Sequence, residues 1–326
     1  MAAVGAYVTL AEAALLTQSD LVIGVIEEVV REGGILDMIP TRTVKGTNLT
    51  YNRENVLPSG TFHSIADSWL ASEDIDLTQV TTTLAIHGDE KRLDDFVKKT
   101  YSSKQDQMAV VTQQTSRGIK QRVERALIYE ATAFTGIHGL ATTNQTQSLG
   151  SGSTGAAGTV TALNRMLDLV RPQADILLCP FRLAQRMDQV QQGVNSSAVV
   201  QINAGTGKAD IRLGGKVTYW RDVPIKRSDY MATPDTGAFR ETIASGTYSA
   251  ETGGATASAF GIRWGEPEDG GVFLAIGDEL FKTVGPYQSE NFNGEWLRIV
   301  SYLATGVGST RALGRCDGIT DVAITA

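Results

Sequence analysis

The sequence predicts an α+β protein, because segments typical of helices and segments typical of strands alternate in blocks along its 326 residues. Three observations support this class. Residues 41–53 and 76–87 are rich in threonine and β-branched residues, residues 104–132 carry apolar side chains at helical spacing, and residues 175–179 form an apolar strand directly before a proline-initiated helix.

Composition narrows the classes of function. The chain has 36 acidic and 29 basic residues and a formal net charge of −7, whereas proteins that read nucleic-acid sequence usually carry a basic patch. Two cysteines, Cys179 and Cys316, are too few for a disulfide scaffold or a four-cysteine zinc site. The longest apolar stretch, residues 21–30, contains two glutamates and is too short to span a membrane. The first seven residues lack lysine and arginine, so we expect no signal peptide.

The first forty residues predict two short helices, from Thr9 and from Asp20 to about Glu32. The second helix has a strongly apolar face that includes Val22, Ile26 and Val29. An amphipathic helix this near a terminus must dock either on its own subunit or on a neighbour. The residues alone leave both alternatives open.

A long β-hairpin is expected next, with residues 41–53 as one arm and residues 76–87 as the other. Its facing apolar residues are expected to be Val44, Leu49 and Tyr51 on the first arm and Val80, Leu84 and Ile86 on the second. The connection, residues 54–75, is longer than most loops in compact domains. It carries four large apolar side chains, Phe62, Ile65, Trp69 and Leu70. Such a tip either folds back on its own core or contacts a partner.

The strongest helical pattern covers residues 104–132, with Glu124 and Arg125 among the polar residues expected away from its apolar stripe. Residues 141–159 are rich in glycine, serine and threonine and predict a connector between two modules. Beyond it we expect helices at 160–170 and 181–191 on either side of the strand at 175–179. A glycine-containing loop region at 194–215 and a strand–turn–strand at 216–229 follow. Three further strands are expected at 260–265, 271–276 and 296–306.

No complete chemical site emerges from the motifs. Residues 205–208 (GTGK) lack the earlier glycine of a phosphate-binding loop, and Ala209 replaces its Ser/Thr. His87 has no second histidine one helical turn away, so we expect a surface histidine rather than a metal ligand. The acidic residues of 266–269 lack calcium-loop spacing, and Cys179 lies in an apolar strand as a buried thiol. We therefore expect no catalytic, cofactor-binding or metal-binding residues.

The order of these elements resembles the major capsid protein of tailed bacteriophages, the Hong Kong ninety-seven-type capsid fold that encapsulin shells share. The segments that carry the resemblance are residues 47–54 (TNLTYNRE) with Leu57 and Pro58, the long helix, residues 175–186 (DILLCPFRLAQR), residues 223–230 (VPIKRSDY) and the closing segment 296–319. The likeness covers about residues 9–320.

The resemblance implies a division of the chain. Residues 1–40 would be an N-terminal arm and residues 41–90 the extended E-loop. Residues 91–140 and 255–300 would form the P-domain, with its spine helix at about 104–132, and residues 141–254 and 301–326 the A-domain. It also implies inter-subunit contacts through Val22, Ile26, Val29, Tyr51, Arg53, Glu54, Phe62, Ile65, Trp69 and Leu70.

The implied function is that of a structural, non-enzymatic subunit of an icosahedral phage head. Pentamers and hexamers of the chain would enclose double-stranded DNA without reading its sequence, in a virion assembled in the bacterial cytoplasm. Portal, scaffolding and decoration proteins would be partners, and no cofactor or membrane is expected. Because the arm begins almost at Met1, we expect a separate scaffolding protein or none. An encapsulin-like shell around an enzyme cargo is the second reading, and a cytoplasmic hydrolase using the region after residue 141 is a third.

We predict noncovalent shells. Some relatives join subunits through isopeptide bonds from an E-loop lysine, whereas residues 54–75 contain no lysine and Lys45 lies back on the hairpin. Denaturing gel electrophoresis of assembled particles is expected to give a single band at the 34.9 kDa of the chain. A ladder of covalent oligomers would contradict the prediction.

Overall fold

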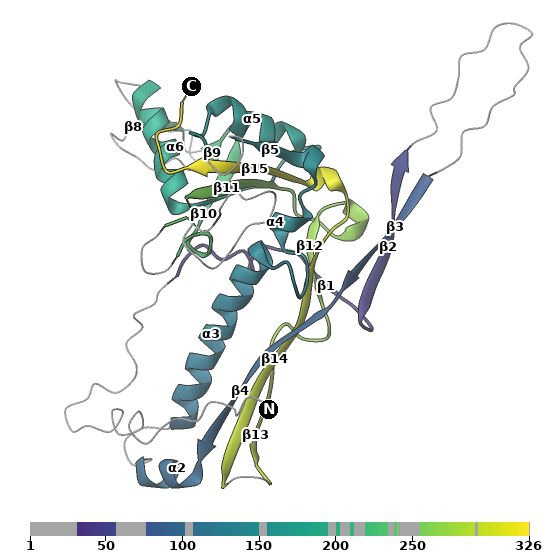
Figure 1. Ribbon diagram of the computed structural model, residues 1–326, viewed down its shortest axis with the longest axis vertical. Coiled ribbons are helices and arrows are strands. Elements are labelled where there is room, and N and C mark those ends of the chain that lie inside the picture. Colours follow the sequence, from purple (N-terminus) through teal and green to yellow (C-terminus); the bar gives the residue numbers. More distant parts are fainter. Residues whose placement is uncertain are drawn as a thin grey trace, which may run out of the picture.

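The computed structural model confirms a mixed α+β architecture (Figure 1). It describes residues 31–56, 76–101, 107–149, 155–194, 200–202, 209–211, 219–233, 238–239, 241, 255–290 and 293–325. Two large sheets organise these residues. A six-stranded sheet lies with α5 and α6 at one end of the molecule, and a five-stranded sheet runs beside the long helix α3 toward the other end.

The six-stranded sheet has the strand order β5-β15-β11-β6-β10-β9. Its strands are β5 (Thr146–Ser148), β15 (Leu313–Thr320), β11 (Thr256–Ile262), β6 (Ile176–Pro180), β10 (Val223–Ser228) and β9 (Tyr219–Trp220). Helices α5 (Val160–Leu169) and α6 (Phe181–Val194) supply Leu163, Met166, Leu183 and Met187 to the core beside it. The predicted strand–proline–helix unit is confirmed, since all five β6 residues are buried and α6 starts directly after Pro180.

The five-stranded sheet is built around β14 (Gly294–Val307). Its other strands are β1 (Thr41–Thr43), β4 (Ala85–Asp94), β12 (Val272–Ile276) and β13 (Lys282–Gln288). β4 pairs antiparallel with β14 from Ala85↔Leu303 to Asp94↔Gly294. β12 and β13 pair with β14 in turn, at its C-terminal and N-terminal halves. β14 therefore supports three other strands.

Helix α3 (Gln107–Tyr129) confirms the predicted long helix and spans about 34 Å at 1.5 Å per residue. Val111, Thr115, Ile119, Val123 and Leu127 are all buried, at a spacing of four residues. This stripe packs toward β4 and β14 because a spacing of three or four residues keeps side chains on one helix face. Short helices α2 (Asp95–Tyr101) and α4 (Ile137–Leu140) flank α3.

The hairpin is shorter than the one expected from residues 41–53 and 76–87. Only β2 (Asn48–Val56) and β3 (Asp76–Thr83) pair with each other, and within them Tyr51, from the expected set on the first arm, lies opposite Val80, from the set on the second. Thr41–Thr43 instead pairs in parallel with β12, and the residues after Leu84 belong to β4 and pair with β14. A β-branched pattern identifies a strand but not its partner, so the sequence could not reveal this change of sheets.

Other segments differ from the sequence analysis in detail. The connector at 141–159 contains η1 (Thr143–Gln145) and β5, which is tied to β15, and the loop region at 194–215 contains the small hairpin β7 (Val200–Ile202) and β8 (Ala209–Ile211). β11 belongs to the six-stranded sheet, although residues 255–300 were expected as one block with the long helix. β13 and β15 had not been predicted as separate strands. Three single turns complete the elements, η2 (Asp229–Met231), η3 (Pro267–Asp269) and η4 (Thr310–Ala312).

The two cysteines lie on one face of the six-stranded sheet without a disulfide bond. Cys316 pairs with Ala259 on β11, and the β6 register places Cys179 opposite the same alanine from the other side. Two strand spacings separate the thiol-bearing strands by about 10 Å, beyond the ~7 Å limit for a disulfide. Burial raises the pKa of each thiol to about 12, so both act as packing groups.

A core substitution tests the packing. Leu178→Ala removes a side chain with no exposed surface and is expected to lower the free energy of unfolding by about 2–5 kcal/mol. Leu77→Ala is the matched control, because Leu77 is 57% exposed and its loss is expected to change stability by less than about 0.5 kcal/mol. Denaturant unfolding of unassembled subunits measures both. Equal effects would contradict the assigned core.

Candidate assembly surfaces

Three of the ten expected contact residues lie in the described part of the chain: Tyr51, Arg53 and Glu54, all on β2. The other seven, Val22, Ile26, Val29, Phe62, Ile65, Trp69 and Leu70, lie outside the described residues. The structure therefore bears on the base of the hairpin and not on its tip or on the arm.

Tyr51 and Arg53 hold the base of the hairpin against the end of β14. The Tyr51 hydroxyl donates to the Val307 carbonyl at 2.7 Å. Arg53 donates from one terminal nitrogen to the same carbonyl at 2.7 Å and from Nε to the Gly308 carbonyl at 2.9 Å. The Tyr51 ring also packs edge-on against Phe273, with 6.0 Å between ring centroids. These bonds lie within one chain, and an inter-subunit role for either residue stays a prediction.

Glu54 lies farther out, where the hairpin leaves the body of the molecule. Its side chain is exposed, and its partner across the ladder, Leu77, is 57% exposed. The register shifts between Glu54 and Val56, as at a β-bulge, which bends a strand. The hairpin therefore projects from the body with an apolar side chain open to a neighbour (Figure 1).

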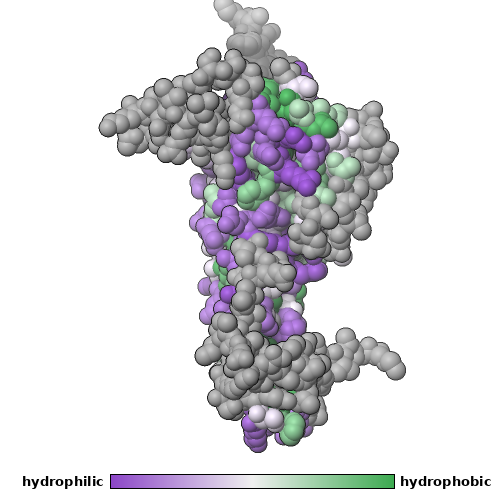
Figure 2. All heavy atoms as spheres, turned by 90° about the vertical axis from the view of Figure 1, so that its left-hand side faces the viewer, coloured by the Kyte–Doolittle hydropathy of each residue, from purple (hydrophilic) through white to green (hydrophobic). Residues whose placement is uncertain are grey.

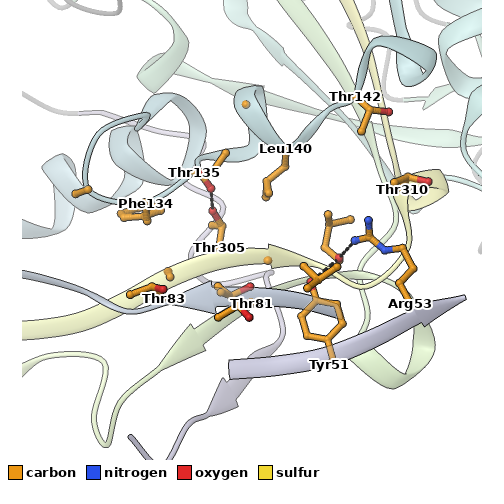
Figure 3. Close-up of a pocket in the computed structure, with 17 residues that line it drawn as sticks. Tyr51, Arg53, Thr81, Thr83, Phe134, Thr135, Leu140, Thr142, Thr305 and Thr310 are labelled. Carbon is orange, nitrogen blue, oxygen red and sulfur yellow. Dashed lines mark hydrogen bonds between the residues drawn. The ribbon is translucent and has the colours of Figure 1, made fainter. Parts of the chain in front are cut away.

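A hollow of about 380 Å³ lies beside this base (Figure 3). Strand β3, the end of β14 and the segment from Ala133 to Thr142 form its walls. Its lining is rich in hydroxyl groups, namely those of Tyr51, Thr81, Thr82, Thr83, Thr135, Thr142, Thr305 and Thr310. The Thr305 hydroxyl donates to the Thr135 carbonyl and so ties the upper wall to β14. Arg53 is the one charged residue in the lining of this hollow.

The five-stranded sheet exposes apolar side chains on its outer surface. Ile86 is 75% exposed and faces Tyr302, which is 40% exposed, across the β4–β14 ladder. Farther along, the rings of Tyr287 and Trp296 lie 5.4 Å apart, and the Arg298 guanidinium lies 5.1 Å from the centre of the Trp296 ring. A row of exposed apolar groups along one sheet is typical of a contact surface.

The start of the described chain is fixed by a buried carboxylate. Glu124 on α3 is 1% exposed, contrary to the expectation that it faces away from the apolar stripe. Its carboxylate accepts the backbone N–H of Ile35 at 2.8 Å and that of Leu36 at 3.3 Å. Gly34 lies so close that a β-carbon there would be 2.3 Å from a carboxylate oxygen. Helical periodicity could not reveal this partner, because the partner is backbone 88 residues away.

Comparisons with solved structures identify the fold. An encapsulin complex from Synechococcus elongatus PCC 7942 matches with a TM-score of 0.63 at 15% identity, over 98% of this chain and 99% of that chain. A structure of Microbacterium phage Oxtober96 matches with a TM-score of 0.61 at 12% identity, over 97% and 99%. The capsid of an empty GTA particle matches with a TM-score of 0.57 at 11% identity, over 91% and 99%.

The chain has the Hong Kong ninety-seven-type capsid fold. Phage capsids, GTA capsids and encapsulins share it, and the matches run over nearly the full length of both partners. No family model matches the sequence, and no curated protein matches it either.

A buried polar cluster within this capsid fold bears on the hydrolase alternative. Tyr129 donates to one carboxylate oxygen of Glu241 at 2.9 Å, Ser258 donates to the other, and Nε2 of His138 lies 3.7 Å from that second oxygen. The serine hydroxyl thus points to the carboxylate and not to the histidine, so no Ser–His nucleophile pair exists here. All four residues are buried, so the cluster joins α3, α4 and β11 rather than facing a substrate.

The remaining polar motifs also have structural roles within the subunit. Arg42 forms ion pairs with Glu266 at 2.7 Å and with Glu268 at 3.2 Å, so these two acidic residues of the turn have a partner within the subunit. His87 is half-buried rather than fully on the surface, and its buried Nε2 has no hydrogen-bond partner among the described residues. Burial and, next, Arg122 lower the pKa of His87. Within the described residues, no three His, Cys, Asp or Glu side chains gather to hold a metal ion, and no helix is long and apolar enough to cross a membrane.

The described surface over α3 is largely hydrophilic (Figure 2). Gln113, Gln114 and Lys120 lie on the exposed side of the helix, opposite the buried stripe. Exposed apolar groups therefore occur on the outer sheet and hairpin rather than on this helix face.

Glu124 predicts a pH dependence. Burial raises its pKa above the ordinary 4.5, so its charged form disfavours the folded state. The folded subunit then binds more protons than the unfolded chain between pH 4.5 and the folded pKa, and this group's contribution to stability rises as pH falls through that window. Glu124→Gln is expected to abolish this contribution. Denaturant unfolding from pH 7 to pH 4.5 measures it, and identical pH profiles for both proteins would refute it.

Proposed function

We propose that this chain is a structural, non-enzymatic subunit that self-assembles into a closed protein shell. The observation that carries the proposal is the structural match to a phage structure and to an encapsulin over at least 97% of this chain and 99% of theirs. A match of this extent covers nearly the whole chain rather than one part of it. Identities of 11–15% establish the fold alone, so assembly is our inference.

We favour a phage-type major capsid protein that forms pentamers and hexamers around double-stranded DNA. The matches to several phages and to the GTA capsid support this form. A net charge of −7 fits DNA that is enclosed rather than bound, because sequence-independent attraction to phosphates requires excess positive charge. The virion would then be its location, with portal, scaffolding and decoration proteins as further partners.

An encapsulin-like compartment is the second candidate. The observation that favours it is the encapsulin match itself, which has a TM-score of 0.63 against 0.61 for the Microbacterium phage. A difference this small does not rank the two candidates. The content of the particle separates them.

For subunit contact, we propose that the hairpin tip lies over an adjacent subunit. Phe62, Ile65, Trp69 and Leu70 of the tip would cover apolar groups such as Ile86 and Tyr302 on the neighbour's outer sheet. The apolar face of the arm, with Val22, Ile26 and Val29, would add a second contact. Each contact is small, and closed symmetry repeats it in every subunit.

Electron microscopy of the purified, expressed protein tests the function. Closed particles of uniform diameter are expected, and a monomer that never assembles at high concentration would overturn the proposal. Particles purified from infected or lysogenic cells distinguish the candidates. Nuclease-protected DNA supports the capsid, whereas a packaged enzyme without DNA supports the encapsulin.

The exposed sheet face gives a substitution test. Ile86→Lys places a charge where a neighbour is expected to pack, and it should prevent or strongly reduce particle formation while leaving the subunit folded, because Ile86 is 75% exposed. Val322→Lys is the matched control, since Val322 is 45% exposed and lies beyond β15 in the other sheet. Light scattering during assembly and circular dichroism of unassembled subunits measure the two effects. Normal assembly of the Ile86 variant would contradict this contact.

A further inference from the structure

Strands β3 and β4 form nearly one continuous strand that exchanges partners at Leu84. The Leu84 N–H donates to the Thr47 carbonyl at 2.9 Å, so even-numbered residues of this strand direct their backbone groups toward β2. Odd-numbered residues direct theirs to the opposite edge. There Ala85 and the following residues pair with β14. By the same alternation, Thr81 and Thr83 direct their backbone groups toward the side of β14.

Strand β14 shows the complementary alternation. Gly308 donates to Gly271 at 2.8 Å and Gly277 donates to the Tyr302 carbonyl at 3.0 Å, so even-numbered residues of β14 bond toward β12. Thr305 and Val307 therefore direct their backbone groups to the other edge, toward β3. Continuing the β4 register would place Thr83 opposite Thr305 and Thr81 opposite Val307.

The ladder nevertheless opens before it reaches these pairs. Among the described residues, pairing between this strand and β14 ends at Ala85↔Leu303. The hollow in Figure 3 lies at this opening, because its lining includes residues 80–83 of β3 and 304–307 of β14. Two backbone edges with unused ladder positions thus face one open space of about 380 Å³.

The hairpin is held in a way that keeps this opening from closing. A zipped ladder would need the Val307 carbonyl as the acceptor for the Thr81 N–H. That carbonyl already accepts hydrogen bonds from Tyr51 and Arg53. By the alternation above, the Thr305 N–H and carbonyl point toward the hollow, and no described residue pairs with them there.

We propose that an extended segment of a second copy of this chain enters the opening as an added β-strand. Its backbone would bond to Thr81 and Thr83 on one side and to Thr305 on the other, and one of its carboxylates would meet Arg53. This inference rests on the proposed assembly. It adds a main-chain contact at the hairpin base that is distinct from the apolar contact of the tip.

The chemistry of the hollow supports this occupant. Unpaired strand edges recognise extended backbone, and β-augmentation is a recurring way to bind it. Arg53 is held by two neutral carbonyls and has no carboxylate partner among the described residues, so an acidic side chain complements it. The chain has 36 acidic residues of its own, and in a shell the nearest polypeptide is another copy. A head-to-tail contact of this kind closes into rings when the subunits are related by rotation.

Hydrogen exchange of the backbone amides is the primary test. The amides of Thr81, Thr83 and Thr305 are expected to exchange freely in unassembled subunits and to slow at least about tenfold in particles, as hydrogen-bonded amides do. The Thr82 amide, directed toward β2, is the internal control and should be protected in both states. If the three amides still exchange freely in particles, the proposed strand insertion is overturned, while the assembly proposal still stands. Failure to form any particle would overturn both.

A double cysteine variant excludes self-closure as the cause of protection. In Thr83→Cys/Thr305→Cys, a zipped ladder would bring the two α-carbons to about 5.5 Å, within disulfide range, whereas an inserted strand would hold them near 10 Å. Cys179 and Cys316 are buried with pKa values of about 12, so they do not compete. Particles under mild oxidant are expected to contain no new intramolecular disulfide. Its quantitative formation in particles would overturn the insertion.

Two substitutions test the contacts themselves. Thr305→Pro removes the N–H and the hydroxyl, whereas Thr305→Val removes the hydroxyl alone and is the matched control. The protein concentration required for particle formation is expected to be about tenfold higher for the proline variant than for the valine variant. Arg53→Gln is expected to make assembly less sensitive to added salt than the wild type. Equal assembly of the Thr305 variants, or unchanged salt dependence for Arg53→Gln, would overturn the corresponding contact.

Discussion

The pairing of β14 is the constraint on which the rest of the structure depends. This one strand bonds to β4 along one edge and to β12 and β13 along the other, and its terminal carbonyls hold the hairpin through Tyr51 and Arg53. Helix α3 packs on β4 and β14. The position of the hairpin relative to the body therefore follows from the point at which β14 ends, since the acceptors are the last residue of the strand, Val307, and the next residue, Gly308.

Elements whose formation depends on local pattern could be predicted from the sequence. Helix α3, strand β6 and helix α6 each follow from periodicity or from Pro180, and all three were found where they were expected. Partners that depend on distant backbone could not be predicted. Thr41–Thr43 pairs with β12 more than 200 residues away, and Glu124 is buried because two backbone N–H groups compensate its charge. Neither partner leaves a signal in the local sequence.

The candidate site divides in the same way. An interest in Tyr51, Arg53 and Glu54 followed from the resemblance to capsid proteins, but the hollow beside them was not foreseen. It forms because one strand changes partners at Leu84, and nothing in the residues on either side of Leu84 marks that change. The alternation of backbone groups becomes informative only after the register of both neighbouring strands is known.

Several of these ties share a property: a side chain from one segment binds the main chain of another. Glu124 binds the amides of Ile35 and Leu36, and Arg53 binds the carbonyls of Val307 and Gly308. A main-chain partner keeps its N–H or carbonyl whatever side chain the position carries, so another side chain of fitting size at Ile35, Leu36 or Val307 would keep the hydrogen bond. Gly308 is the exception, because a β-carbon there would lie 2.7 Å from the backbone of Gly270. The fold therefore tolerates substitutions at such positions. This tolerance offers a physical account of a fold that is shared at 11–15% identity while no family model matches this sequence.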